Sequence, residues 1–231
     1  MSNYTYKEFI GMKKVTALLV GWSIALSFAL CGCSGGDTFT QKSYASGENE
    51  IEKITLQAED REVEIDVSGD EKVYIDYFDG QKETIDITVS ESKELTVKRV
   101  DHKKWTDFIG TKPAKEYRKI KIRIPDNRIA SLTVDTTNED ITVHALSFTQ
   151  HVSLAANGGN IVCERIRVGE SVCLKTKNGN ITGTVIGGWD DFSIACKIKK
   201  GKCNLPTLKE GGQKSFSADC NNGNIHVEFV Q

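Results

Sequence analysis

Apolar and polar residues alternate in short runs along most of this chain from residue 51 onward. In the first half, apolar positions lie two apart within each run, and polar turns such as Ser68-Gly69-Asp70 separate the runs. The runs are centred on Ile54 and Leu56, on Val63, Ile65 and Val67, on Val73, Ile75 and Tyr77, on Ile85, Ile87 and Val89, and on Leu95 and Val97. A period of two places one side of a strand in the core. Short strands separated by turns predict an all-β domain.

The second half of the chain repeats one unit five times, in which an apolar strand is followed by a four-residue polar turn. The turns are Thr137–Asp140, Asn157–Asn160, Lys177–Asn180, Lys199–Lys202 and Asn221–Asn224. The residues that follow them are Ile141, Ile161, Ile181, Cys203 and Ile225, at spacings of 20, 20, 22 and 22. A fixed period of this size is typical of stacked repeats. The sequence therefore predicts a β-solenoid with coils of about 20–22 residues.

Alignment of the five units on the residue after each turn produces inward-facing columns. Seven residues earlier stand Val134, Leu154, Leu174, Cys196 and Ala218, and five residues earlier stand Thr136, Ala156, Thr176, Ile198 and Cys220. Two residues later stand Val143, Cys163, Gly183, Leu205 and Val227. These columns are apolar or small and alternate with polar ones, as expected for strands with one buried face.

The turns contribute two further columns with a structural interpretation. Gly159, Gly179, Gly201 and Gly223 share one column, where we expect glycine because a sharp turn needs positive φ. Asp140, Asn160, Asn180, Lys202 and Asn224 share the next, where asparagines can hydrogen-bond along the stack. The lysine turn of the fourth unit is expected to interrupt this ladder. A calcium site would need several carboxylates, so no metal is expected at the turns.

The N-terminus carries an export signal. Met12-Lys13-Lys14 precedes an apolar run from Val15 to Leu30, which is typical of a secretory signal. The run has sixteen residues, fewer than the roughly 20 that a spanning helix needs. It ends in Leu30-Cys31-Gly32-Cys33, which resembles a bacterial lipobox. The resemblance implies cleavage before Cys33 and a diacylglycerol on its thiol, so that a lipid anchors the protein outside the bacterial cell membrane. Met1 and Met12 both remain possible starts.

Three regions follow from these features. Residues 1–32 are expected to be the lipoprotein signal peptide. Residues 33–50, rich in Ser, Gly, Thr and charge, are expected to be a flexible tether. Residues 51–231 form one solenoid domain, whose pattern breaks only at Val100–Lys119. The formal net charge is −2, and it becomes −4 without residues 1–32. This acidity disfavours nucleic acid as a partner.

The cysteines behind Cys33 do not predict a disulfide framework. Five remain: Cys163, Cys173, Cys196, Cys203 and Cys220. An odd number cannot all pair within one chain. The columns place all of them inward except Cys173, and a buried free cysteine behaves as a small apolar residue. We therefore expect free thiols, although the sequence leaves their redox state open.

The combination of lipobox, β-rich first half, Ile124-Pro125-Asp126 and repeated Asn-Gly-Asn-Ile strings resembles the bacterial "putative adhesin" domain family of unknown function. The strings here are Asn138-Glu139-Asp140-Ile141, Gly158-Gly159-Asn160-Ile161, Asn178-Gly179-Asn180-Ile181 and Asn222-Gly223-Asn224-Ile225. The resemblance spans residues 51–231 and implies a right-handed β-solenoid at the cell surface. The family supplies no catalytic residues to transfer.

Catalytic and cofactor signals are weak. Glycoside hydrolysis needs two carboxylates that flank one bond, and Asp190-Asp191 beside Trp189 is an acidic pair in the repeat region. Neighbouring strand residues point to opposite faces, so this pair is not expected to converge. The four histidines show no zinc-like spacing. We expect neither a cofactor nor an enzyme activity.

The best interaction candidates are Trp105 and Phe108, in the break of the pattern, together with Trp189. Exposed aromatic residues among charged ones often mark binding surfaces, although Trp105 and Phe108 could instead cover the open end of the solenoid. The sequence thus predicts a lipid-anchored, adhesin-like binding module for wall polymer, glycan or an envelope protein. An envelope-stress sensor or scaffold is the alternative, and a carbohydrate-active enzyme is a weaker one.

Overall fold

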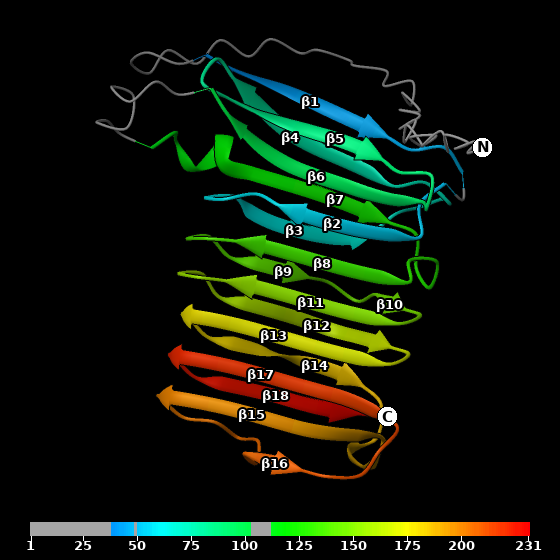
Figure 1. Cartoon of the computed structure of the whole chain (residues 1–231), viewed down its shortest axis with the longest axis vertical. Helices are drawn as coiled ribbons and strands as arrows, with labels where there is room; N and C mark the ends of the chain where they lie inside the picture. Colours follow the sequence, from blue (N-terminus) through cyan, green and yellow to red (C-terminus); the bar gives the residue numbers. More distant parts are fainter. Residues whose placement is uncertain (1–37, 49, 103–111) are drawn as a thin grey trace, which may run out of the picture.

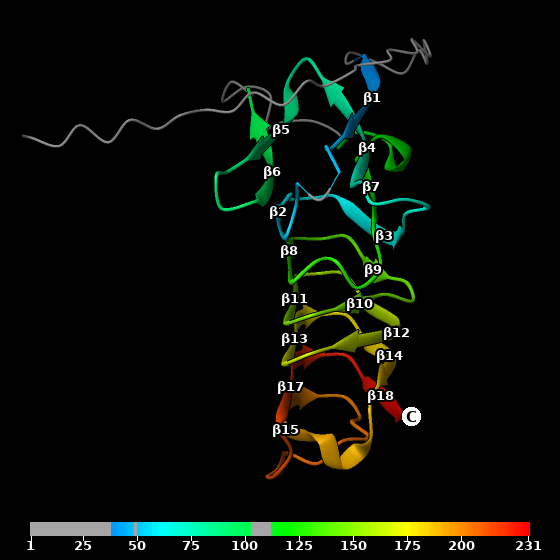
Figure 2. The same ribbon diagram turned by 90° about the vertical axis from the view of Figure 1, so that its right-hand side faces the viewer.

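The computed structural model describes residues 38–48, 50–102 and 112–231, and this part of the chain is built of strands and two short 3-10 helices. Two nine-stranded sheets face each other and form the two walls of a tall stack (Figures 1 and 2). The all-β solenoid predicted from the repeat is confirmed. Figure 2 shows the walls diverging at the end that holds β1 and β5.

The first wall, called sheet A, contains the strands that follow the repeat turns. In spatial order it comprises β1 (Phe39–Ala45), β4 (Tyr74–Gly80), β7 (Lys119–Ile124), β3 (Glu62–Val67), β9 (Ile141–Val143), β12 (Ile161–Val168), β14 (Ile181–Ile186) and β18 (Ile225–Val230), with β10 (Ser147–Phe148) paired to β12.

The second wall, called sheet B, contains the strands that precede the turns. Its order is β5 (Glu83–Val89), β6 (Glu94–Asp101), β2 (Lys53–Gln57), β8 (Ser131–Thr136), β11 (His151–Ala156), β13 (Ser171–Asn178), β17 (Lys214–Asn222), β15 (Phe192–Lys200) and β16 (Leu208–Lys209). The 3-10 helices are η2 (Lys115–Arg118) and η3 (Trp189–Asp191).

The strand registers reproduce the columns read from the sequence. In sheet B, Leu154 lies opposite both Val134 and Leu174 in parallel pairs. In sheet A, Ile161 lies opposite both Ile141 and Ile181. All six of these side chains are buried, so the repeat builds a continuous apolar core between the walls.

The coils do not stack in chain order. The last unit, β17 and β18, lies between the third unit and β15 (Figure 1). Leu174 on β13 therefore pairs with Ala218 rather than with Cys196, and Ile225 pairs with Ile181 on one side and bridges Cys203 on the other. In the first half, β2 and β3 likewise lie between the β6–β7 coil and the β8–β9 coil.

This order corrects the expectation that a lysine turn interrupts the asparagine ladder. The Asn180 amide N–H donates to Asn160 Oδ1 at 2.9 Å, and Asn224 N–H donates to Asn180 Oδ1 at the same distance. Lys202 lies at the end, where its N–H donates to Asn224 Oδ1 at 2.9 Å. The ladder continues unbroken because the fourth unit is the terminal coil.

The glycine column has the expected cause, positive φ, at only two of its four positions. Gly201 and Gly223 have φ of 131° and 149°, but Gly159 and Gly179 do not have positive φ. A Cβ on Gly179 would meet the carbonyl oxygen of Gly159 closer than real Cβ atoms approach. Glycine is thus required at all four of these positions because neighbouring turns pack backbone against backbone, whereas the first turn carries Glu139 in this column.

Part of the expected tether belongs to the folded unit. Residues Phe39–Ala45 form β1, which pairs antiparallel with β4 over seven residues. Phe39 stacks on Tyr117 with ring centroids 4.8 Å apart. The low apolar content of residues 33–50 concealed this strand, since as an edge strand β1 buries only part of its side chains.

Candidate functional site

Of the residues proposed from the sequence as anchor or interaction sites, the structure describes Trp189. Cys33, Trp105 and Phe108 lie outside the described residues. Trp189 lies in η3, is 43% exposed and packs edge-on against Phe229 with ring centroids 5.5 Å apart. Lys209 Nζ lies 5.5 Å from the centre of the Trp189 ring. One side of Trp189 therefore belongs to the aromatic packing at the terminal coil, and the other side faces solvent.

The two carboxylates beside Trp189 diverge. Asp191 Oδ2 accepts a hydrogen bond from the Gly188 amide at 2.7 Å and closes the turn. The Asp190 side chain is 98% exposed, with Oδ1 3.8 Å from Lys209 Nζ. They do not flank a common space, as expected, but the reason is their place in the 3-10 helix η3 and not the alternation of a strand.

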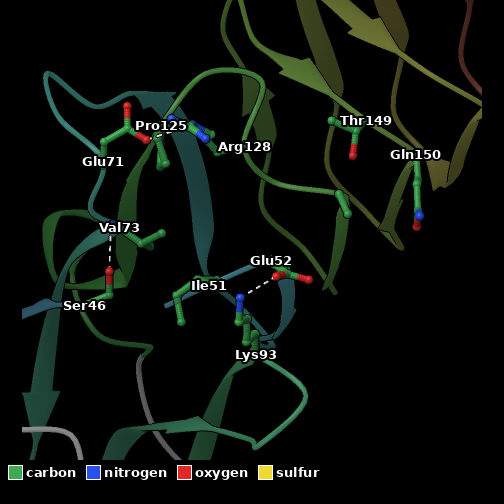
Figure 3. A pocket seen from close by; sticks show the side chains of 11 residues that line it. Ser46, Ile51, Glu52, Glu71, Val73, Lys93, Pro125, Arg128, Thr149 and Gln150 are labelled. Atoms are coloured by element: carbon green, nitrogen blue, oxygen red, sulfur yellow. Dashed lines mark hydrogen bonds and ion pairs between the residues drawn. The ribbon is translucent and has the colours of Figure 1, made fainter. Parts of the chain in front are cut away.

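A pocket of about 360 Å³ lies along one edge of the stack (Figure 3). Its lining comes from turns that join the two walls: Ser46, Ile51, Glu52, Glu71, Val73, Lys93, Pro125, Arg128, Ala130, Thr149 and Gln150. Its charges are already paired. Lys93 Nζ lies 2.6 Å from Glu52 Oε1, and Arg128 Nε lies 2.8 Å from Glu71 Oε2. A charged ligand would have to break these ion pairs.

A second hollow, called here the sheet B groove, lies at the opposite edge, over the carboxyl ends of four adjacent strands (the left-pointing arrowheads of β8, β11, β13 and β17 in Figure 1). It has a volume of about 430 Å³. Ala155 lies in register between Asp135 and Lys175, so a short side chain forms its floor. The rim is polar: Asp135, Thr137, Asn157, Lys175, Lys177, Asp219 and Asn221.

The rim of the sheet B groove differs from that of the pocket in its hydrogen bonding. Within the described part of the chain, no side-chain hydrogen bond or ion pair is formed by Asp135, Asn157, Lys175, Lys177, Asp219 or Asn221. Two carboxylates, two ammonium groups and two amides thus remain free to bind a ligand. The sequence does not reveal this groove, because its members come from four separate repeat units.

The outer face of sheet B beside the groove carries mostly small side chains. One row across it contains Thr55, Thr133, Ser153, Cys173, Ser217 and Ala195, and the next contains Lys53, Ser131, His151, Ser171, Ser215 and Ser193. Parallel strands lie about 4.8 Å apart, so hydroxyl groups recur at that interval. A long ligand can lie along the first of these rows without meeting a bulky side chain.

The outer face of sheet A carries a histidine among carboxylates. His144 Nδ1 lies 2.8 Å from Glu164 Oε2, and its Nε2 lies 3.4 Å from Glu64 Oε1 and 3.6 Å from Asp66 Oδ1. The hydrogen bond with Glu164 raises the pKa of His144, with smaller contributions from the other two carboxylates, while partial burial lowers it. Among the described residues, Glu64, Asp66 and His144 offer three donor atoms within 4.8 Å of one another.

These three donors already have a cation beside them. Lys121 Nζ lies 2.9 Å from Asp66 Oδ2 and 3.5 Å from Glu64 Oε1. We therefore interpret the group as an ion-pair network between coils. The sequence does not predict this network, because β3, β7 and β9 are adjacent only after the coils have stacked out of chain order.

Comparisons with known proteins agree with this architecture. A family model described as Toastrack DUF4097 matches residues 51–231. A crystal structure of a "putative cell adhesion protein" from Clostridium sporogenes ATCC 15579 is 10% identical, with a TM-score of 0.59 over 82% of this chain and 98% of that one. This likeness shows a shared fold. No significant match is found among curated proteins.

Two further crystal structures are similar at a lower level. A "putative adhesin" from Bacteroides fragilis NCTC 9343 is 16% identical, with a TM-score of 0.38 over 85% of this chain and 100% of that one. A "putative lipid binding protein" from Parabacteroides distasonis ATCC 8503 is 11% identical, with a TM-score of 0.26 over 83% and 97%. In the described ranges, no helix has the length and apolar character to cross a membrane.

Proposed function

Because the chain belongs to the Toastrack DUF4097 family, we propose that it is a non-catalytic binding module of the bacterial cell surface, held at the membrane by a lipid on Cys33. The lipobox supports the anchor. The solved structures named as adhesion proteins support a surface role, although those names describe other chains.

The free polar rim of the sheet B groove carries this proposal. We assign the binding surface to this groove rather than to the pocket of Figure 3, whose charged side chains are neutralised by one another. Lys175 and Lys177 suit anionic groups, and the amides of Asn157 and Asn221 suit hydroxyl groups. The ligand class is accordingly a hydroxyl-rich polymer with ionic groups, such as a wall polymer or a charged glycan.

The spacing of the groove carboxylates supports binding without cleavage. Asp135 on β8 and Asp219 on β17 occupy one column and are separated by β11 and β13. Three inter-strand steps of about 4.8 Å put their backbones roughly 14 Å apart. Glycoside hydrolases place their two carboxyl groups roughly 5–9.5 Å apart. The groove can therefore hold a chain of sugars but lacks a pair placed to hydrolyse it.

The test is retention of the purified full chain on cell-wall preparations and on a panel of neutral and anionic polysaccharides, with released sugar ends assayed in the same samples. We expect retention on an anionic polymer, no new sugar ends, and a loss of at least about tenfold with Lys175→Glu, since one interaction of about 1.4 kcal/mol corresponds to that factor.

Lys98→Glu is the matched control, because Lys98 is an exposed lysine on the same face of sheet B but outside the groove. It should bind as the wild type does. Equal losses in both variants would contradict the groove assignment. New sugar ends would contradict a non-catalytic role, and no retention on any polymer would favour an envelope-protein partner or a sensor.

A further inference from the structure

The terminal coil of the solenoid differs from every other repeat unit at two core columns. In the other units, the column seven residues before the alignment position and that position itself hold apolar pairs: Val134 and Ile141, Leu154 and Ile161, Leu174 and Ile181, and Ala218 and Ile225. In the terminal coil they hold Cys196 and Cys203, and the two Sγ atoms lie 2.9 Å apart.

This coil also has little support on its outer side. On its outer side, β15 pairs with the two-residue strand β16 over only two residue pairs. On the sheet A side, Cys203 makes an isolated bridge to Ile225. Apolar packing comes from one neighbouring coil instead of two. A covalent bond between its two walls would replace the stabilisation that a second neighbour gives the inner coils.

We propose that Cys196 and Cys203 form a disulfide that closes the terminal coil after export. A disulfide needs a sulfur–sulfur distance of about 2.0 Å, so the present 2.9 Å requires only a small adjustment of the side chains. The pairing is compatible with the odd number of cysteines, because one disulfide uses two of the five and three remain as thiols. The proposal is independent of the binding function assigned to the sheet B groove.

The surroundings of the two sulfurs indicate the order of reaction. Cys203 is partly exposed, so an oxidant can reach its Sγ, which accepts a hydrogen bond from the Leu205 amide at 3.3 Å. Cys196 is buried, and burial raises its pKa to about 12. Cys203 therefore attacks first, on the disulfide of an extracytoplasmic thiol oxidoreductase, and forms a mixed disulfide with it while one oxidant sulfur leaves as a thiol. Cys196 then loses its proton and attacks the Sγ atom of Cys203 in the mixed disulfide. This step releases the second sulfur of the oxidant as a thiol. The protein loses two electrons and two protons, and the oxidant becomes a dithiol.

The remaining cysteines are placed to stay reduced. Cys163 is completely buried in sheet A. Cys220 Sγ donates to the Gly179 carbonyl at 3.3 Å. Cys173 is exposed on the outer face of sheet B, where its register neighbours are Ser153 and Ser217. None of the three has a sulfur partner within hydrogen-bonding distance in the described part of the chain.

The test uses the full chain with its own N-terminus, expressed in a bacterial host and alkylated with N-ethylmaleimide at lysis. Peptide mapping should find Cys196 joined to Cys203 in the exported protein, with Cys163, Cys173 and Cys220 alkylated after denaturation. Purified reduced protein should form the same bond with oxidised glutathione. Dithiothreitol should lower the Tm of wild type and of Cys173→Ser by several degrees and leave that of Cys203→Ser unchanged.

Alkylation of both Cys196 and Cys203 in exported, folded protein would overturn the proposal. So would a bond from either residue to Cys173 or Cys220, or a Tm that is insensitive to dithiothreitol in the wild type. The mapping is done on wild-type protein, so the test does not depend on whether Cys203→Ser folds.

Discussion

Glu64 on β3 lies directly opposite Lys121 on β7, with Oε1 3.5 Å from the lysine Nζ. The same strands pair Glu62 with Lys119 and Asp66 with Arg123. Glu62, Glu64 and Asp66 of β3 thus face a row of only basic side chains on β7. Opposite charges across a ladder stabilise it and like charges destabilise it, so this pattern favours β7 as the neighbour of β3 although β4, β5 and β6 intervene in the chain.

Reversal of one charge should weaken this pairing. Glu64→Lys places a positive side chain beside Lys121 and should lower the free energy of unfolding by about 1 kcal/mol, as both groups are well exposed. Glu64→Lys combined with Lys121→Glu should recover most of the loss. Urea unfolding measures both, and Glu91→Lys, in an exposed turn, is the control. A double variant no more stable than Glu64→Lys would refute the pairing role.

The close approach of the turns makes the glycine column intolerant of a side chain. Gly179→Ala puts a Cβ against the Gly159 carbonyl, and the turns must separate. Overpacking of this kind costs about 1–3 kcal/mol. Gly69→Ala is the matched control, because a Cβ there has no heavy atom within 4 Å. Thermal unfolding should separate the two variants clearly, whereas similar small shifts would mean that the turns have room.

The asparagine ladder should contribute to stability one step at a time. Asn180→Ala removes the acceptor of the Asn224 amide and the 3.3 Å hydrogen bond from Asn180 Nδ2 to Asn160 Oδ1. We expect a loss of about 1 kcal/mol, because the exposed partners regain water. Asn157→Ala, an exposed turn residue without a side-chain hydrogen bond in the described chain, should change the urea midpoint far less. Equal effects would argue against the ladder.

Much of the fold was predictable because a period of two and a fixed repeat length report directly on strands and columns. The inward placement of Cys163 and the outward placement of Cys173 followed from parity alone. The order of the coils did not, since each repeat carries the same apolar columns and any two units can pair in register. One physical signal for the order does exist, namely the opposite charges on the outer faces of β3 and β7.

The binding surface was less predictable than the fold. A search for aromatic residues selected Trp189, half of which packs against Phe229. The sheet B groove arises where the short side chain of Ala155 lies between Asp135 and Lys175, each of which is 20 residues from Ala155 in sequence. The groove becomes evident only when an outward column is compared across repeat units, whereas the apolar repeat defines the inward columns and the turns.

The histidine network on sheet A should make stability depend on pH. The folded state raises the pKa of His144 above its usual value of 6.5, chiefly through the hydrogen bond with Glu164 and also through Asp66 and Glu64. The folded state therefore binds this proton more tightly than the unfolded chain does. The contribution of protonated His144 to the free energy of unfolding is fully present below the pKa of the unfolded state. It is lost as the pH rises through the higher pKa of the folded state.

The measurement is urea unfolding between pH 5.5 and 8.5 for the wild type and for His144→Gln, which keeps hydrogen-bonding groups but cannot take the proton. The wild type should be more stable than the variant at pH 5.5, and the difference should shrink as the pH rises. His226→Gln is the control, because the exposed His226 lies near a single carboxylate, that of Glu228 at 3.6 Å. A stability difference that stays constant, or one that grows with pH, would show that the carboxylates around His144 do not hold its proton in the folded state.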